Sequence, residues 1–189
     1  MTYKVLSFEP VLGYLRKRKL NKNIVALMYH EIACDSDDIE AWTVVKESDF
    51  VRQMEYLSAQ FNIISLKDAL SQINNRDAYK MQRPSIVITF DDGYRGNRKV
   101  LFPIVKSMNI PVTIFVATKA VQDGKVYWYD RLFNALQGDK VITLNLNRLS
   151  LGNYQINKHK GVKNWGEVER LLFDLKKLEP KGREKAVES

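Results

Sequence analysis

The stretch that most constrains this chain is SIVITFDDGYRGN, at residues 85–97. Its first part, SIVITF, is uncharged and rich in β-branched residues, which is typical of a strand buried on both faces of a parallel sheet. Two adjacent carboxylates, Asp91 and Asp92, follow directly, and Gly93 then permits a sharp turn. Functional groups of parallel α/β folds sit at the carboxyl ends of strands. The pattern therefore favours a functional role for the aspartate pair.

The rest of the first two thirds of the chain alternates between apolar runs and amphipathic segments. Strands are predicted at residues 24–30, 61–66, 85–90 and 110–118, and helices at 47–60, 65–75, 95–109 and 127–137. This alternation predicts an α/β fold with parallel strands and right-handed crossovers. The acidic segment between the first strand and the first helix is predicted to be a loop.

Helix ends and faces can also be predicted. Ser48 and Ser65 are the expected N-caps of the first two helices, and Pro103 should kink the third. The buried face of the first helix should carry Phe50, Met54 and Leu57.

After Gly138 the pattern changes. Residues 140–157 alternate between apolar and polar side chains and predict a hairpin, residues 165–178 predict an amphipathic helix, and the tail is polar. We therefore expect three parts: a basic amino-terminal segment (1–23), a parallel α/β part (24–137) and a hairpin-plus-helix insertion with its tail (138–189).

Charge and composition exclude some functions. The 189 residues have a net charge of +8, but basic residues are mixed with acidic ones and no basic-aromatic signature is present, so nucleic acid is not an expected partner. The basic segment at residues 16–19 suits either a solvated helix or a peripheral contact with an anionic membrane. The lone Cys34, the lack of a signal-peptide pattern and the lack of a long apolar run slightly favour the cytoplasm.

Two readings of the aspartate pair can be weighed from the residues alone. One is an Asx-turn that merely ends the strand. The other is a divided chemical role, in which one carboxylate binds a metal and the other accepts a proton. The phosphate-binding loop, the dinucleotide glycine motif and the Gly-x-Ser-x-Gly elbow are absent from the sequence, which excludes the chemistries that depend on them.

The segment VITFDDGYRGN resembles the first motif of the polysaccharide deacetylases, carbohydrate esterase family 4, also called the NodB homology domain. ALMYHEI, FVRQMEYLSAQFNIISLKDAL, LFPIVKSMNIPVTIFVAT and YWYDRL occur in the order seen in one branch of that family, so the resemblance covers residues 24–134. It implies the amino-terminal part of a deformed (β/α) barrel, similar to a TIM barrel, and hydrolysis of acetyl groups on a sugar polymer by metal-activated water.

The resemblance also implies roles for single residues. Asp91 matches the general base of the family, and Asp92 matches a ligand of a divalent metal, usually zinc. His30, at the end of the first strand, is expected either to bind substrate or to shape the rim of the site. Four aromatic residues are candidates for stacking on sugar rings or for packing in the core: Trp42, Tyr127, Trp128 and Tyr129.

The sequence departs from the family pattern after Asp92. The His-[Ser/Thr]-x-x-His motif that supplies two further metal ligands is absent, and the one histidine in this part, His159, is expected in an exposed loop. We expect a truncated piece rather than a degenerate relative, inactive as it stands. An open sheet of about four parallel strands should then expose an edge at residues 110–118 and self-associate. The alternatives are a non-catalytic carbohydrate-binding or scaffold relative and a peripheral membrane partner in polysaccharide assembly.

Overall fold

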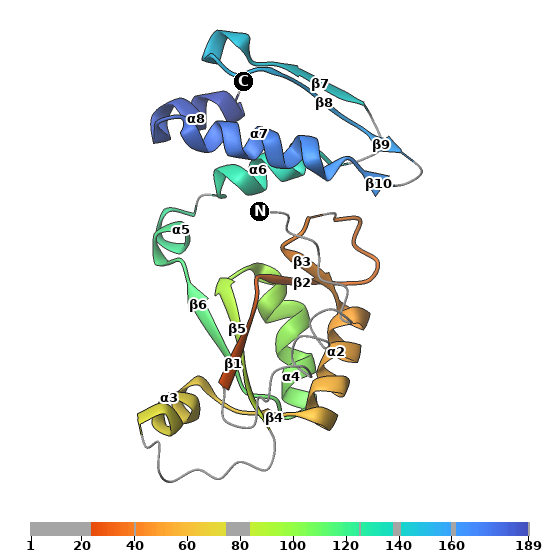
Figure 1. Cartoon of the computed structure of the whole chain (residues 1–189), viewed down its shortest axis with the longest axis vertical. Helices are drawn as coiled ribbons and strands as arrows, with labels where there is room; N and C mark the ends of the chain where they lie inside the picture. The colour runs from red at the N-terminus through yellow and green to blue at the C-terminus, as the bar shows by residue number, and fades with distance from the viewer. Residues whose placement is uncertain are drawn as a thin grey trace. The chain divides into compact units, whose positions relative to one another are not determined.

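The structure is a computed structural model that describes residues 24–39, 41–74, 84–124, 126–137, 141–159 and 162–188, without the side chains of 158, 159, 162 and 163. The chain forms two compact units, Met1–Ala117 and Thr118–Ser189 (Figure 1). The division falls before the predicted insertion boundary at residue 138, because the helix α6 (Trp128–Ala135) packs against the carboxyl-terminal helix α8 (Pro180–Glu188).

The first unit is built on a four-stranded parallel sheet. Its strands are β1 (Ile24–Tyr29), β4 (Asn62–Ile63), β5 (Ser85–Asp92) and β6 (Val112–Val116). β5 is central, with β1 along one edge; β4 and β6 share its other edge, β4 beside Ser85 and Ile86 and β6 beside residues 88–92. The predicted α/β fold with an open parallel sheet is confirmed, and the sheet does not close into a barrel within the described residues.

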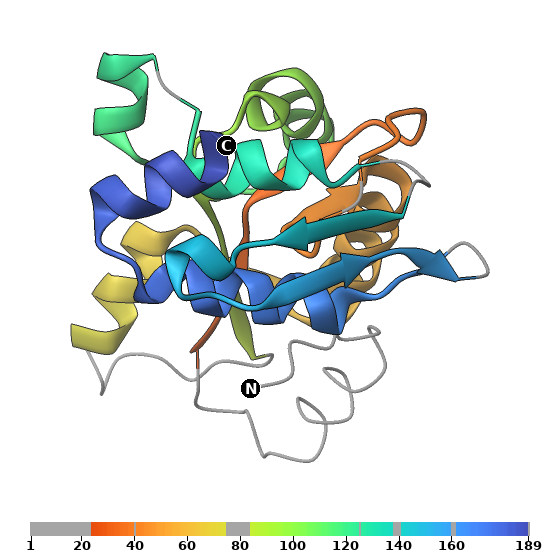
Figure 2. The ribbon, with the colours of Figure 1, turned by 90° about the horizontal axis from the view of Figure 1, so that it is seen from above.

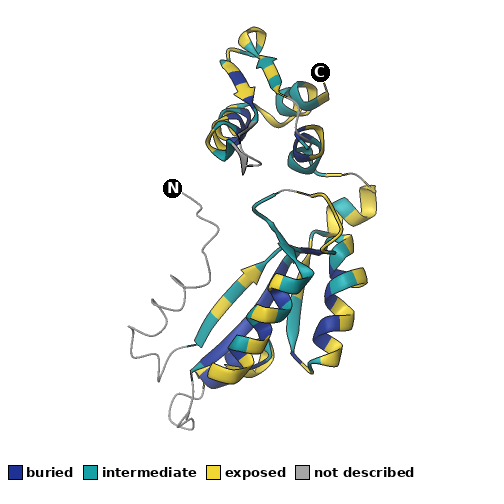
Figure 3. Cartoon of the chain, turned by 90° about the vertical axis from the view of Figure 1, so that its right-hand side faces the viewer, coloured by how far each residue is buried: buried dark blue, intermediate teal, exposed yellow. Residues whose placement is uncertain are grey.

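One face of the sheet is covered by α2 (Glu47–Gln60), η1 (Asn97–Leu101), which is a π-helical turn, and α4 (Phe102–Ser107). Alternate residues of β5 point to this face, namely Ile86, Ile88 and Phe90, and all are buried. Figure 3 shows buried segments, in dark blue, on the sheet and on the helices that cover it. The α2 residues predicted to face the core do so: Phe50, Met54 and Leu57.

The opposite face is covered at one end only. There α3 (Leu66–Asn74) contributes Ala69, which packs with Ile64 against Val87 of β5. Away from α3, the described part of this face carries exposed side chains at its edges, with Met28 of β1 62% exposed and Phe115 of β6 52% exposed, whereas Thr89 of β5 is buried. The predicted exposed edge is present in the described part of the chain, where β6 pairs only with β5 and Ile114, Phe115 and Val116 are exposed. The predicted self-association through this edge stays a prediction.

The ends of the helices agree only partly with the predictions. Ser65 Oγ accepts a hydrogen bond from the Asp68 backbone at 3.1 Å, as expected of an N-cap. Ser48 does not cap α2, which begins after Lys46; the Ser48 N–H instead bonds the Asp35 carboxylate at 3.1 Å. Pro103 lies in the first turn of α4, directly after the π-helical turn, so the expected irregularity precedes the proline.

The segment predicted to be a loop contains two short strands, so that prediction was wrong in part. β2 (Glu31–Ala33) and β3 (Val44–Lys46) pair in parallel. Strands of three residues give too little alternation to be recognised in a sequence.

The second unit has α5 (Thr118–Asp123), α6 (Trp128–Ala135), β7 (Ile142–Asn145), the 3₁₀ turn η2 (Asn147–Leu149), β8 (Asn153–Ile156), β9 (Lys158–His159), β10 (Val162–Lys163), α7 (Trp165–Lys177) and α8 (Pro180–Glu188). The predicted hairpin and helix are confirmed: β7 and β8 pair antiparallel and lie along α7 (Figures 1 and 2).

Two features of this unit differ from expectation. The polar tail forms α8, which is attached to α6 by ion pairs of Arg131 with Glu184 and Glu188. His159 lies in β9 opposite Val162 rather than in a loop. In the ranges that the structure describes, no helix has the length and apolar character needed to cross a membrane. The predicted membrane-contacting segment, 1–23, lies outside those ranges.

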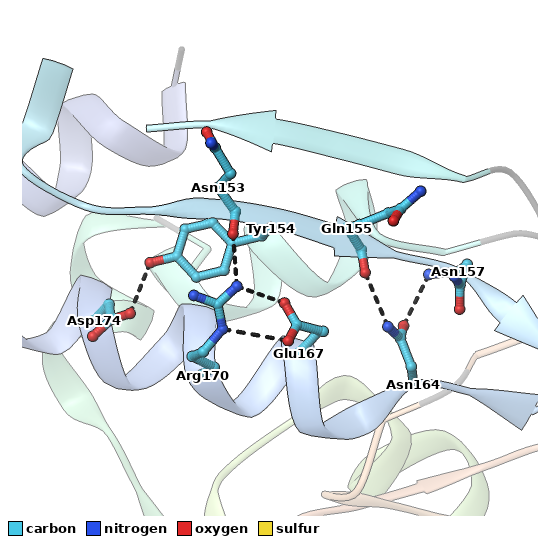
Figure 4. Close-up of polar contacts among 8 residues, drawn as sticks. All are labelled: Asn153, Tyr154, Gln155, Asn157, Asn164, Glu167, Arg170 and Asp174. Atoms are coloured by element: carbon cyan, nitrogen blue, oxygen red, sulfur yellow. Dashed lines mark hydrogen bonds and ion pairs between the residues drawn. The ribbon is translucent and has the colours of Figure 1, made fainter. Parts of the chain in front are cut away.

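A polar network joins the hairpin to α7 (Figure 4). The buried Tyr154 donates its hydroxyl proton to Asp174 Oδ2 at 2.8 Å, and the Arg170 guanidinium lies 4.2 Å from the centre of its ring. Asn164 accepts a hydrogen bond from the Asn157 N–H at 2.8 Å and donates to the Gln155 carbonyl at 2.9 Å. The network thus fixes β8 to α7 at several points.

This network predicts acid sensitivity of the second unit. The Lys177 ammonium, followed by the Tyr154 hydroxyl, lowers the pKa of Asp174 below its ordinary value of 3.8. A lowered folded-state pKa stabilises the fold above the unfolded-state value, and this stabilisation is lost as the pH falls through the folded-state pKa. We expect the melting temperature of the second unit to fall below about pH 4, and to fall less in Asp174→Asn.

The measurement is thermal unfolding followed by tryptophan fluorescence in a Trp42→Phe background, where Trp128 and Trp165, both in the second unit, are the reporters. Glu169→Gln, an exposed change on the same helix, is the control. Equal acid sensitivity of Asp174→Asn and the control would contradict the assignment.

Candidate functional site

The sheet brings the candidate residues of the first unit to one rim. Asp91 and Asp92 form the carboxyl end of β5, and His30 directly follows the last residue of β1. Tyr29 pairs with Phe90, so the next step along both strands sets His30 beside Asp91. The predicted placement of these three residues on one rim is confirmed, while their chemical roles stay predictions.

Strand alternation also assigns a face to Asp91. Phe90 points into the core under α2 and α4, so Asp91 points to the opposite, open face. Phe115, its partner on β6, is half exposed there. On β1, Tyr29 packs on the core and Met28 is exposed, which places His30 on the same open face as Asp91.

The backbone turns sharply at Asp92. The Gly93 N–H donates to the Asp91 carbonyl at 2.9 Å, and Asp92 has a φ of 70°. A hydrogen bond between residues two apart around a positive φ is the rare and strained form of the γ-turn. Strain of this kind is concentrated at functional sites. The turn ends the strand at Asp92.

Gly93 continues the turn with a φ of 75°. A Cβ atom at this position would lie 3.2 Å from both methyl groups of Val116 on β6. The backbone conformation, and to a smaller degree the space, therefore favour glycine after the aspartate pair.

The segment after the turn lies directly on β2. The Gly96 N–H donates to Glu31 Oε1 at 3.3 Å, and a Cβ on Gly96 would lie only 2.3 Å from the Ile32 carbonyl oxygen. Glu31 follows His30 in the chain, so His30 is held between two attachments to the motif: the Tyr29–Phe90 pairing and the Glu31–Gly96 contact. Sequence reasoning missed this contact, although a second glycine so close to the aspartates is a signal for close backbone approach.

Asn97 begins the π-helical turn and is 3% exposed. Neither its amide nitrogen nor its amide oxygen has a hydrogen-bond partner among the described residues. Buried polar groups are nearly always paired, often by water, and π-helical turns are frequent at functional sites. The stretch with unusual backbone geometry and a buried polar side chain therefore extends from Asp91 to Asn97.

An aromatic cluster lies on the core face of the sheet, next to the rim. The rings of Tyr29 and Phe90 are stacked with centroids 5.3 Å apart, and Phe50 packs edge-on against both. The Tyr29 hydroxyl donates to Gln53 Oε1 at 2.8 Å, and burial raises the pKa of Tyr29. This rigid cluster fixes the strand ends that carry His30 and Asp91.

The aromatic candidates for sugar stacking belong largely to the second unit. Tyr127 and Tyr129 stack on each other at 5.0 Å, and the Arg183 guanidinium lies 4.8 Å from the Trp128 ring centre. These rings are engaged in packing within the protein, which agrees with the expectation of a packing role rather than of stacking on sugar rings. Trp42 lies in a turn before β3 and is partly buried.

A catalytic zinc ion normally has three protein ligands. The described residues contain no group of three or more His, Cys, Asp or Glu side chains placed to hold a metal. Asp92 is a suitable ligand type, but the described residues do not complete a zinc site.

Part of the chain matches a known protein family. Residues 78–159 match the family model described as polysaccharide deacetylase. The predicted resemblance is confirmed. The matched range includes Asp91, Asp92 and the segment to Asn97, and it continues into the hairpin of the second unit, whereas His30 lies before it.

Solved structures give partial similarity. IcaB from Ammonifex degensii is 22% identical, with a TM-score of 0.45, and the match covers 59% of this chain and 48% of IcaB. The Streptococcus pyogenes deacetylase PplD, in complex with acetate, is 21% identical, with a TM-score of 0.46 and coverage of 59% and 52%. A de-N-acetylase from Aggregatibacter actinomycetemcomitans is 18% identical, with a TM-score of 0.43 and coverage of 80% and 51%. The chain thus spans about half the length of these structures. No curated protein sequence gives a significant match.

The contact at Gly96 leads to a test of the rim. Gly96→Ala should destabilise the first unit by about 1–3 kcal/mol, because the added methyl group meets a backbone oxygen that cannot move away freely. Gly166→Ala is the matched control, since a Cβ there meets nothing within 4 Å and alanine favours the α7 helix.

Hydrogen exchange of residues 91–97 measures the local effect. We expect faster exchange in Gly96→Ala and no change there in Gly166→Ala. Unchanged exchange and stability in Gly96→Ala would show that the motif segment does not depend on its contact with β2.

Proposed function

We propose that this chain supplies the aspartate-bearing part of a polysaccharide deacetylase-type hydrolase, which removes acetyl groups from a sugar polymer. The observation that supports the proposal best is the aspartate pair at the open rim of β5, inside the stretch that matches the polysaccharide deacetylase family. An acetylated polysaccharide or oligosaccharide is the corresponding proposed substrate.

Asp91 is proposed as the general base. It lies on the open face of the sheet, where a substrate can approach, and the stacked Tyr29 and Phe90 hold its strand end in place. A carboxylate in this position can accept the proton of a water molecule that attacks the acetyl carbon. Its attachment to a rigid strand, rather than to a loop, favours the fixed geometry that catalysis requires.

His30 is proposed as a substrate-binding residue on the same rim. An imidazole can donate or accept one hydrogen bond through each of its nitrogens, which suits a sugar hydroxyl or an acetyl oxygen. The attachments of Tyr29 and Glu31 on either side support this role, because they fix the backbone from which His30 extends.

Asp92 is proposed as one ligand of a divalent metal, with zinc as the first candidate. Asp92 lies at the sharp turn that ends the strand, where the Gly93 N–H bonds the Asp91 carbonyl. The proposal needs at least two further ligands from outside the described residues.

Metal titration tests the role of Asp92. We expect the chain to bind Zn²⁺ or Co²⁺ weakly, with at least a tenfold loss in Asp92→Asn and little loss in Asp91→Asn, because only the first change removes a metal ligand. Isothermal titration calorimetry measures both variants. Equal losses in the two variants would contradict the division of roles.

Activity tests the function itself. We expect negligible acetate release from acetylated oligosaccharides by the isolated chain, because one carboxylate ligand holds zinc poorly. Acetate release that depends on Asp91 and on added zinc would contradict the expected inactivity and would support the hydrolase directly. Binding of the oligosaccharide that is unchanged in His30→Ala and Asp91→Asn would favour a non-catalytic carbohydrate-binding relative.

A further inference from the structure

The carboxyl-terminal helix α8 is too short and too polar to be stable by itself. It has nine residues, PKGREKAVE, with a glycine at its third position. Isolated helices of this length are marginal in water, and a glycine inside the helix weakens them further. The helical form of this segment must therefore depend on contacts with the rest of the second unit.

Apolar packing contributes little to holding α8. None of its side chains is buried, whereas the neighbouring α7 buries Val168, Leu171, Leu172 and Leu175. The α8 residues that are partly buried are Gly182, Arg183, Ala186 and Val187. This set includes just one apolar side chain larger than that of alanine. The burial that stabilises α7 is thus largely missing in α8.

Charged side chains connect α8 to α6 in both directions. The Arg131 guanidinium of α6 forms ion pairs with Glu184 and Glu188, which lie one turn apart on α8, and its Nη1 is 3.4 Å from Glu188 Oε1. In return, the Arg183 guanidinium of α8 lies 4.8 Å from the centre of the Trp128 ring on α6. Because Trp128 and Arg131 are three residues apart, they share one face of α6. Figure 1 shows α6 and α8 in the same layer of helices.

The ion pairs are accessible to solvent. The side chains of Arg131, Glu184 and Glu188 are 33%, 49% and 63% exposed. Ion pairs with this exposure are weakened by salt, because the Debye length falls from about 10 Å at 0.1 M to about 3 Å at 1 M ionic strength. Burial of apolar side chains is not screened in this way. A rise in ionic strength therefore acts on α8 and spares α7.

From the short helix, its lack of buried side chains and its exposed ion pairs, we propose that α8 is a charge-held strap. At low ionic strength it lies on α6 and covers one face of the Trp128 ring. At high ionic strength it detaches and loses its helical form, while α7 and the β7–β8 hairpin keep theirs. Detachment makes the Trp128 ring and the Arg131 guanidinium accessible, so the exposed surface of the second unit changes with ionic strength.

Hydrogen exchange of the full chain, followed by mass spectrometry, measures the attachment. We expect amide exchange in residues 184–188 to become at least about tenfold faster when sodium chloride is raised from about 50 mM to about 1 M, because these amides lose their helical hydrogen bonds on detachment. Residues 168–175 of α7 are the internal reference, and their exchange should change less than about twofold.

Substitutions test the ion pairs directly. Arg131→Gln removes both pairs and should give fast exchange in α8 already at low salt. The matched control is Arg148→Gln, which changes an exposed arginine of the same unit and should leave α8 protected. Protection of residues 168–175 establishes that each variant is folded.

The carboxylates of α8 can be tested in the same way. Glu184→Gln with Glu188→Gln should detach α8 as Arg131→Gln does. Lys181→Gln with Lys185→Gln changes two exposed charges of the same helix and should leave it attached.

An exchange of charges separates ionic attachment from a requirement for these particular side chains. Arg131→Glu alone should detach α8, and the addition of Glu184→Arg and Glu188→Arg should restore its protection at low salt. Fluorescence in a Trp42→Phe/Trp165→Phe background provides a second readout. Acrylamide should quench Trp128 more strongly once Arg183 leaves the face of its ring.

Three results would overturn the proposal. Exchange in α8 that does not respond to salt would show that uncharged contacts hold the helix. Equal exchange in Arg131→Gln and Arg148→Gln would show that the ion pairs contribute nothing. A loss of protection at high salt that extends to residues 168–175 would show that the whole unit unfolds rather than releasing a strap.

Discussion

The burial of β5 is the constraint on which the first unit depends. Ile86, Ile88 and Phe90 anchor α2, η1 and α4 on one face, while β1, β4 and β6 all pair with this strand and not with each other. Its last two residues carry charge, and a charged side chain is costly to bury unless it is paired. The strand must therefore emerge from the core at Asp91, and the exposed rim follows from the same requirement that builds the sheet.

The sequence predicted the parts of the structure whose pattern is local. The strand 85–90, the buried face of α2, the Ser65 cap and the hairpin of the second unit follow from apolar periodicity and turn chemistry. Strand order could not be predicted, because it depends on contacts between distant segments. β1 pairs with one edge of β5, and β4 pairs only with the first two residues of β5 on its other edge. Periodicity also gave no signal for β2, β3 or α8.

In the candidate site, too, local features could be predicted from the sequence, whereas contacts between distant segments could not. Two adjacent aspartates after a buried strand, with glycine next, were enough to predict the position of the rim, and His30 was correctly expected beside it. The Glu31–Gly96 contact and the buried Asn97 were missed, since each depends on how the segment after the turn lies on β2. In the second unit, the contacts of Tyr154 with Asp174 and Arg170 likewise depend on the packing of the hairpin on α7.

The shared edge of β5 divides one strand between two partners. β4 pairs only with its first residues, and β6 pairs only from Ile88 onward, so the amino and carboxyl halves of β5 are held along this edge by different segments. Local opening requires loss of only the contacts that hold the opening segment. A fluctuation that frees β6 would therefore loosen the strand at Asp91 and Asp92 while its buried beginning stays paired with β4. The end of the strand that carries the aspartate pair can thus have its own local stability, lower than that of the sheet to which it belongs.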